Sequence, residues 1–490
     1  MITTHHRVDS SKRPTSSRAS EPVPDSGAKE TDVSYNSQDA AVMSPSSTRL
    51  KVGDGGTLDK AKLSQTIQKK DGAYVYEPSD KRFHAAVSLA AVGKTIDMFE
   101  SALGKPIQWA FGTGKLGIVA DGGEDFNAYY SRDDKNLNFF HGTDPVTKKT
   151  VFSADSGEVV SHEAGHAILD GLRPGYFSSW SPDPAGFHES FGDVMGMLTS
   201  LQDERVLDKV VEQTGGDLKK PNVLSNTGEE LGIAINNVTH RNTTGGDYVR
   251  TAINDFKWKD PSTLPDVGGP NELGSEAHSY SRLWTGAVYD VLTGMVKEGM
   301  DAGQDAKTAL RNAGTELLKM TANLFKTAPH GDFTYREMAK SYVDAENKYN
   351  GGKHSDLVVK VFTDRNILQA GDADNLKSEA GEASSSIFKT QDEATRLVKV
   401  SLSGPQYGMF SGAVVETPVD ADGALTKDAE VTQRTRDNMQ RLIESGRVKY
   451  ADPGQKLTQK DMFDASGRPY MGVVRWIDGQ MTIERTKIAT

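Results

Sequence analysis

The chain contains no cysteine among its 490 residues, which excludes disulfide bonds, a cysteine nucleophile and a cysteine-ligated metal. It has no run of about 18 consecutive apolar residues, the length that a membrane-spanning helix needs, so we expect no membrane span. No apolar run follows Met1, so we expect no cleavable secretory signal. The formal net charge is −11 without a basic stripe, and we therefore expect neither nucleic acids nor anionic membranes as partners.

Apolar clusters are scarce at the start of the chain, and we predict that residues 1–70 form a disordered segment. Beyond it, apolar spacing predicts an α+β protein with these elements: a helix over 84–103, strands near 107–111, 116–119, 127–130 and 137–140, and helices over 281–300, 306–324 and 335–349. We divide this part into an N-terminal α+β lobe (71–200), a mainly helical lobe (201–370), a linker (371–387) and a C-terminal appendage of unknown role (388–490). In the appendage, the turn Asp478-Gly479 between two apolar runs predicts a β-hairpin.

The pentapeptide His162-Glu163-Ala164-Gly165-His166 carries the clearest chemical signal. Two imidazoles four residues apart lie on one face of a helix, as a zinc site requires. Glu163 is placed to take a proton from a water that the metal activates. The pattern is typical of a hydrolytic zinc site, but a motif this short also arises by chance in buried helices, so other residues must decide.

A second acidic motif follows in the segment from Phe187 to Asp193. We predict that Glu189 is the third zinc ligand and that Asp193, one helical turn further on, accepts the second ring N–H of a ligating histidine. His188 points elsewhere on that helix, and we expect it to be structural. A zinc site with a third histidine would need Gly at 169 and His at 172, and both positions are leucine.

With these residues the chain resembles the thermolysin-like zinc metalloproteases of the gluzincin group. Two further stretches that resemble this family are Asn127-Ala128-Tyr129-Tyr130 and residues 274–281, which contain His278. A weaker match is Tyr248-Val249-Arg250-Thr251. The resemblance covers the two lobes. It implies a two-lobe fold with the zinc helix at its centre, one Zn²⁺ per chain, and endopeptidase activity on a peptide or protein substrate.

The resemblance also implies roles for individual residues. Glu163 would be the general base, and His278, assisted by Tyr176 and oriented by Glu272, would donate to the oxyanion. The substrate main chain would add to an edge strand at Asn127 and Ala128. Arg250 would hold a substrate carbonyl.

Departures from the family leave some properties open. The interval from His166 to Glu189 implies an insertion within 174–184. Glu158 lies where the family has a calcium ligand, but Ser200 falls where an acidic partner is expected, so calcium binding is uncertain. An exopeptidase motif of the GxMEN type is absent, which favours an endopeptidase.

Other interpretations stay open. The chain could be a catalytically inactive protein that keeps a protease fold for binding, or a zinc hydrolase of non-peptide amides. As a peptidase it could be cytoplasmic, or it could be a bacterial effector or toxin exported by a specialised route. The Ser-rich start and the lack of cysteine favour export. The sequence indicates no oligomeric state.

Overall fold

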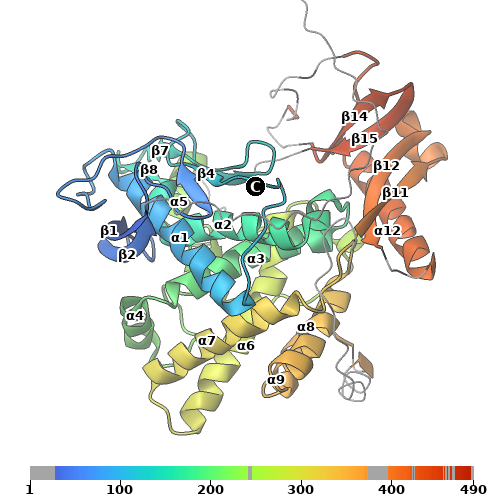
Figure 1. Ribbon diagram of the computed structural model, residues 1–490. Helices are drawn as coiled ribbons and strands as arrows, with labels where there is room; N and C mark the ends of the chain where they lie inside the picture. The colour runs from blue at the N-terminus through green and yellow to red at the C-terminus, as the bar shows by residue number, and fades with distance from the viewer. Residues whose placement is uncertain are drawn as a thin grey trace, which may run out of the picture.

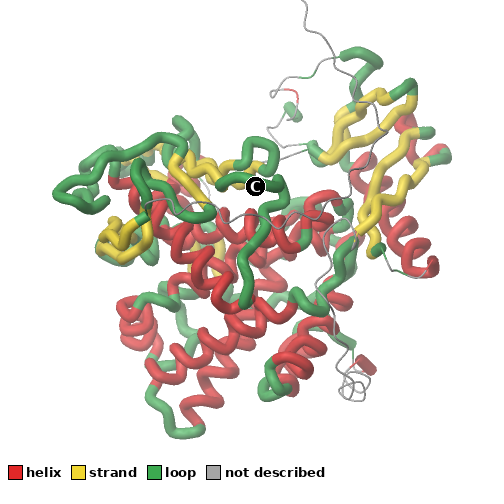
Figure 2. The backbone as a smooth tube through the Cα atoms, viewed as in Figure 1, coloured by secondary structure: helices red, strands yellow, loops and turns green. Residues whose placement is uncertain are grey.

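The computed structural model describes residues 28–240, 245–369, 371–372, 395–421, 423, 425–455, 457, 461, 464–465 and 470–486. Helices and strands are mixed throughout, which confirms the predicted α+β class. Figure 1 shows helices at the centre and lower part of the molecule, with strand-rich regions at two separate ends, and Figure 2 shows the same division by colour. Among the described residues, no helix is both long and apolar enough to cross a membrane.

The first strands lie inside the segment for which we predicted disorder. β1 (Lys29–Tyr35) pairs antiparallel with β2 (Ser46–Val52). Val33, Tyr35 and Val52 are buried in the same core as α1 (Phe83–Leu103). The prediction is therefore wrong for residues 28–70, because alternating apolar residues in two separated stretches bury one face only after the stretches pair. Residues 1–27 lie outside the described part of the chain.

A four-stranded sheet follows, in the order β3 (Ala61–Leu63), β4 (Leu116–Val119), β6 (Asn136–Phe139) and β5 (Ala128–Ser131). β5 pairs only with β6 and forms one edge of this sheet, as predicted for the stretch beginning at Asn127. The strand predicted at 107–111 does not form, because the N–H of Ile107 bonds the Glu100 carboxylate and the Trp109 indole donates to Lys60 O. A short hairpin joins β7 (His141–Thr143) and β8 (Thr150–Phe152).

The centre of the molecule is built from α2 (Gly157–Leu172), α3 (Pro182–Ser200) and α6 (Ala277–Asp301), which pack in that order. Glycines allow α2 and α3 to approach closely: a Cβ on Gly192 would lie 2.6 Å from Nδ1 of His162. The remaining elements of this part are α4 (Glu204–Thr214), β9 (Asn226–Thr227), α5 (Glu229–Thr239), β10 (Arg250–Thr251), α7 (Ala306–Leu324), α8 (Tyr335–Tyr349) and α9 (Ser355–Asp364). Short 3₁₀ turns occur at η1 (Ser153–Asp155), η2 (Pro174–Ser178) and η3 (Pro261–Thr263).

The C-terminal tail, residues 395–486, forms its own sheet in the order β11 (Thr395–Leu402), β12 (Ala413–Asp420), β15 (Gln480–Arg485), β14 (Gly472–Ile477) and β13 (Val448–Lys449). It also contains η4 (Pro405–Phe410) and the helix α12 (Leu425–Glu444). The predicted hairpin is confirmed: β14 and β15 join through Asp478 and Gly479, both with positive φ. Residues 373–387 of the predicted linker lie outside the described part of the chain.

The tail packs directly on the rest of the molecule. Trp180, from the segment between α2 and α3, is buried in the core of the tail. Its indole N–H donates to the carbonyl of Glu416 on β12 at 3.0 Å. The tail is therefore a separate sheet that is anchored to the body by a large aromatic side chain.

Candidate metal centre

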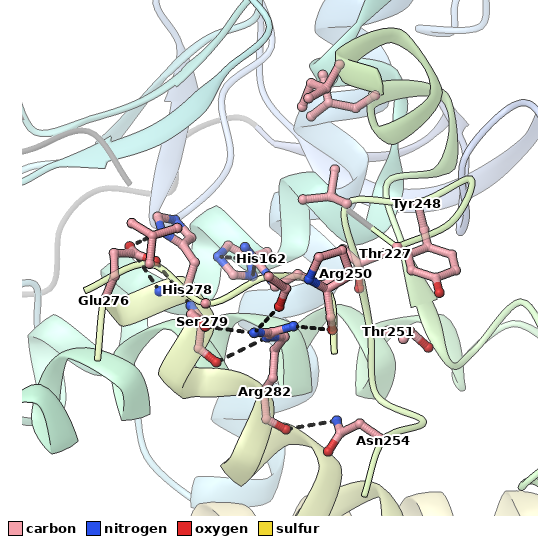
Figure 3. A pocket seen from close by; sticks show the side chains of 18 of the residues that line it. His162, Thr227, Tyr248, Arg250, Thr251, Asn254, Glu276, His278, Ser279 and Arg282 are labelled. Carbon is pink, nitrogen blue, oxygen red and sulfur yellow. Dashed lines mark hydrogen bonds and ion pairs between the residues drawn. The ribbon is translucent and has the colours of Figure 1, made fainter. Parts of the chain in front are cut away.

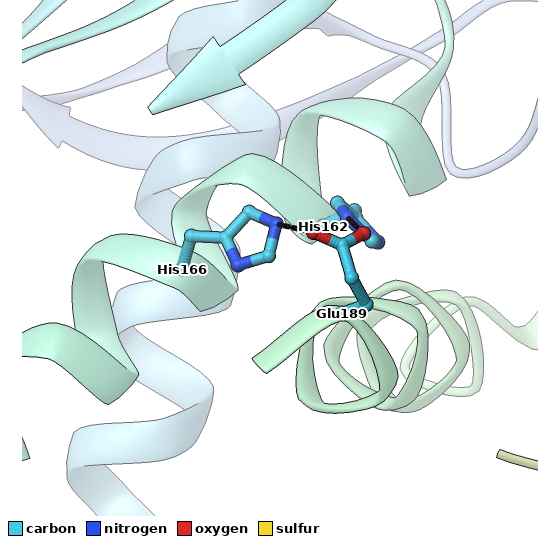
Figure 4. Close-up of side chains that lie close together, drawn as sticks. All are labelled: His162, His166 and Glu189. Carbon is cyan, nitrogen blue, oxygen red and sulfur yellow. Dashed lines mark ion pairs between the residues drawn. The ribbon is translucent and has the colours of Figure 1, made fainter. Parts of the chain in front are cut away.

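The two histidines of the pentapeptide and Glu189 meet between α2 and α3 (Figure 4). Nε2 of His162 lies 3.5 Å from Oε2 of Glu189, and Nε2 of His166 lies 3.5 Å from Oε1 of the same carboxylate. One helical turn of α2 separates the histidines, and α3 supplies the carboxylate from the opposite side. One ligand atom from each residue lies within 4.8 Å of the other two, so the group could hold a metal ion.

The three side chains are buried, with exposed fractions of 5% or less. Within the described part of the chain, Nε2 of His166 and Oε2 of Glu189 have no hydrogen-bond partner. Since buried polar atoms are nearly always paired, these atoms point to a ligand between them. Two imidazoles and one carboxylate are a donor set that suits zinc and leaves a further coordination position open.

The charges around this group place Glu189 and His166 in the forms that bind a metal. Burial lowers the pKa of His162, but Asp193 and Glu189 outweigh it and raise the pKa to about 9, so His162 must lose a proton when it binds a metal. Burial raises the pKa of Glu189, but the neighbouring His278, His166 and His162 outweigh it and hold the pKa well below its usual range. Burial lowers the pKa of His166 to about 3, which leaves a neutral imidazole, the form that binds a metal. The pair therefore offers one carboxylate and one uncharged nitrogen donor at neutral pH.

Asp193 lies where the sequence predicted it, beside His162 of the candidate metal group. Its Oδ1 accepts from Nδ1 of His162 at 3.0 Å and from the guanidinium of Arg250 at 2.9 Å, and its Oδ2 accepts from the Thr285 hydroxyl at 3.2 Å. Burial raises the pKa of Asp193, but Arg250 and His162 outweigh it and lower the pKa to about 2. A charged carboxylate on Nδ1 orients the ring so that Nε2 of His162 faces Glu189 and the candidate metal position.

His188 makes a contact that was not predicted from the sequence. Its Nδ1 lies 2.8 Å from Nδ1 of His166, and its ring packs on Phe177 with centroids 4.1 Å apart. If Nε2 of His166 binds a metal, Nδ1–H of His166 donates to His188. The signal for this contact was the place of His188 directly before Glu189, on a helix that crosses α2 closely.

A pocket of about 820 Å³ opens beside the group and is lined by one of its members, His162 (Figure 3). It is lined by Asn127, Ala128 and Arg250, all predicted to bind substrate, and by Glu163 and His278. An apolar set that the sequence did not single out lines another part of the wall: Phe126, Val159, Leu231, Ile235 and Val249. Burial raises the pKa of Glu163 to about 7, and its Oε2 has no hydrogen-bond partner among the described residues.

His278, near the start of α6, lies close to the ligand group, with Nε2 3.4 Å from Oε2 of Glu189. Its Nδ1 bonds Oε1 of Glu276 at 2.6 Å. Burial lowers the pKa of His278, but Glu189 and Glu276 outweigh it and raise the pKa to about 9. The prediction that Glu272 orients His278 is wrong, because Glu272 is exposed and Glu276, the N-cap of α6, holds this position.

The structure also corrects the role predicted for Tyr176. This residue lies in η2, is 1% exposed, and donates its hydroxyl to the carbonyl of Pro329 at 2.6 Å. Its ring packs against Phe187 and Phe333, and it does not line the pocket. Tyr176 is therefore part of the core.

A second group of acids lies on another side of α2. Asp39, Glu158 and Glu229 are buried, with oxygens within 4.8 Å of one another, so they could hold a cation. Burial, and then the charge of Asp39, raises the pKa of Glu229 to about 7. Ser200 is not part of the group, because its hydroxyl donates to Ser37 O at 2.9 Å and accepts from the Gln38 amide at 2.7 Å.

No family model matches the chain, and no curated protein matches it either.

Proposed function

We propose that the protein is a zinc-dependent endopeptidase of the thermolysin-like type. The observation that carries this proposal is the meeting of His162, His166 and Glu189 beside a pocket that His162, Glu163 and His278 line. A metal site with a base on one side and a hydrogen-bond donor on the other is the arrangement that amide hydrolysis requires.

The two-lobe architecture belongs to the same proposal. α2 and α3 carry the ligands, between the strand-rich N-terminal part and the helices α6 to α9 (Figure 1). The pocket lies where residues of β5, α2 and the start of α6 meet. A site between two structural halves agrees with where ligand pockets are generally found.

The edge strand β5 supports a peptide as substrate. Its first residue, Ala128, and the preceding Asn127 both line the pocket, and β5 pairs with β6 on one side only. An extended peptide can add to such an edge through main-chain hydrogen bonds, while its side chains reach the pocket wall. The apolar residues of that wall suit an apolar side chain.

Glu163, His278 and Arg250 each have a separate role in the reaction. When bound to His162, His166 and Glu189, a zinc ion supplies Lewis-acid polarisation of the scissile carbonyl and lowers the pKa of the attacking water. Glu163 takes the proton of that water and later delivers it to the leaving amine. His278, held by Glu276, donates from Nε2 to the oxyanion. Arg250 holds Asp193 in place and presents its remaining donors to the pocket.

The experiment that tests this proposal combines metal analysis with peptide cleavage. Protein purified without chelators should contain about one zinc per chain, and a peptide library should show internal cleavage that a chelator abolishes and zinc restores. Glu189→Gln should lower zinc content strongly, whereas Glu416→Gln, on β12 of the tail, is the control that should not. Zinc binding without any cleavage would favour an inactive binding protein and overturn the proposal.

A further inference from the structure

The tail contacts the body through ion pairs in which the tail supplies the basic partner. Arg434 of α12 pairs with Asp332 at 2.9 Å, and Arg447, just before β13, pairs with Asp266. Asp332 and Arg447 are only 2% and 4% exposed. Charged groups this buried are costly unless paired, so these contacts fix the tail in one orientation.

Asp266 stands at the base of a loop that forms one wall of the pocket. Residues 267–271 line the pocket directly. Two backbone hydrogen bonds of 2.9 Å close the base, from Ser275 N to Pro265 O and from Glu276 N to Asp266 O. The two limbs of the loop approach so closely that a Cβ on Gly274 would lie 2.3 Å from Gly268 N. A displacement of Asp266 at the base of the loop would therefore also displace residues 267–271 of the pocket wall.

The loop is held at two points. Its tip is fixed from α6, where Arg282 donates to the carbonyls of Pro270 and Gly269 at 2.7 and 3.2 Å (Figure 3). Its base is fixed from the tail by Arg447. That arginine is itself rigidly placed, because its backbone N–H donates to Leu442 O and its carbonyl accepts from Met471 N, both at 2.7 Å.

Asp266 joins the tail to the candidate oxyanion donor. Its carboxylate is held by Arg447, and its carbonyl accepts the N–H of Glu276. The carboxylate of Glu276 in turn holds Nδ1 of His278 and caps α6. A continuous series of charge-assisted and backbone hydrogen bonds thus runs from the tail to Nε2 of His278.

We propose that Arg447 is a positioning residue, through which the C-terminal tail fixes the pocket wall and the place of His278. The kinetic consequence of this inference rests on the proposed function, but its structural consequence does not. The tail is then part of the active-site support, and the body without it would keep the metal ligands but lose the fixed pocket wall.

The test uses the full chain with Arg447→Met, Asp266→Asn and the double variant. The control is Arg475→Met, which removes a tail arginine whose partner, Glu484, also lies in the tail. Asp266→Asn keeps the backbone carbonyl that holds Glu276, so it removes the charged contact alone. Hydrogen exchange of the amides in 264–278 should be at least tenfold faster in all three test variants and unchanged in the control.

Peptide hydrolysis supplies the second measurement. The kcat of each single variant should fall about tenfold. The kcat of the double variant should be no lower than that of the single variants, because both substitutions break the same contact. Zinc affinity should stay at the wild-type value. Wild-type exchange in Arg447→Met, or additive losses of kcat in the double variant, would overturn the inference. If the wild type cleaves no peptide, the proposed function fails, and the exchange measurement still decides the role of Arg447.

Discussion

Asp193 is the residue whose removal tests the metal centre most thoroughly short of changing a ligand. It accepts hydrogen bonds from Nδ1 of His162 and from Arg250, and it is 5% exposed. Asp193→Ala leaves the ring of His162 without its acceptor and leaves the Arg250 guanidinium beside the metal position without its closest counterion. We therefore expect two separate losses, one in metal affinity and one in stability.

The magnitudes follow from these two contacts. Loss of the carboxylate that orients a ligating histidine weakens metal binding by about 10- to 100-fold. Removal of one partner of a buried ion pair costs about 3–5 kcal/mol of the free energy of unfolding, because the other charge stays buried. Asp193→Asn keeps an oxygen for His162 but not the charge for Arg250, so it should lose less zinc affinity than Asp193→Ala.

Chelator competition gives the zinc dissociation constants, and urea unfolding of the zinc-free proteins gives the stabilities. The matched control is Asp170→Ala. Like Asp193, Asp170 is a buried carboxylate in an ion pair, but it lies on α2 and its partner is Arg132. It should destabilise the protein without weakening zinc binding. If Asp193→Ala bound zinc as tightly as the wild type, the assignment of Asp193 to the support of His162 would be wrong.

Three further outcomes are expected. Trp180→Ala empties the core of the tail and should lower the free energy of unfolding by about 3–5 kcal/mol, and an unchanged urea midpoint would contradict the docking of the tail. Burial raises the pKa of Asp183 to about 7, so its protonation stabilises the fold below about pH 4 and this contribution is lost as the pH rises through 7. The free energy of unfolding of Asp183→Asn, relative to that of the wild type, should therefore rise by up to about 4 kcal/mol from pH 4 to pH 8. A difference that does not change with pH would refute this. His278→Ala should lower kcat and kcat/KM alike, on the order of a hundredfold, whereas a helix-start role alone would leave kcat per folded molecule unchanged.

The helical parts of the candidate site were predictable because helix geometry fixes their spacing. The positions of His162 and His166 follow from their separation in sequence, and those of Glu189 and Asp193 follow from theirs. Glu276 could also have been found, since an acidic residue two positions before His278 is well placed as a helix N-cap. The prediction of Glu272 in this role is wrong because Glu272 lies in a loop whose path cannot be determined from sequence spacing.

The remaining errors arise from contacts between distant parts of the chain. β1 buries its apolar face only by pairing with β2 and packing on α1, so the local composition suggested disorder. Tyr176 is buried because its ring packs on Phe187 and Phe333 and its hydroxyl reaches Pro329 O, and nothing in the local sequence indicates these contacts. Long-range packing of this kind decides loop conformation after the helices are set.

The most direct test of the central claim is hydrolysis of an end-blocked peptide by the zinc-loaded wild type and by Glu163→Gln at equal zinc content. An acetylated and amidated peptide offers no free terminus, so its cleavage reports endopeptidase activity. We predict internal cleavage by the wild type and a loss of at least about a hundredfold in kcat for Glu163→Gln, which keeps the ligands but removes the base. Cleavage by Glu163→Gln at the wild-type rate, or by the wild type after its zinc has been removed, would contradict the account.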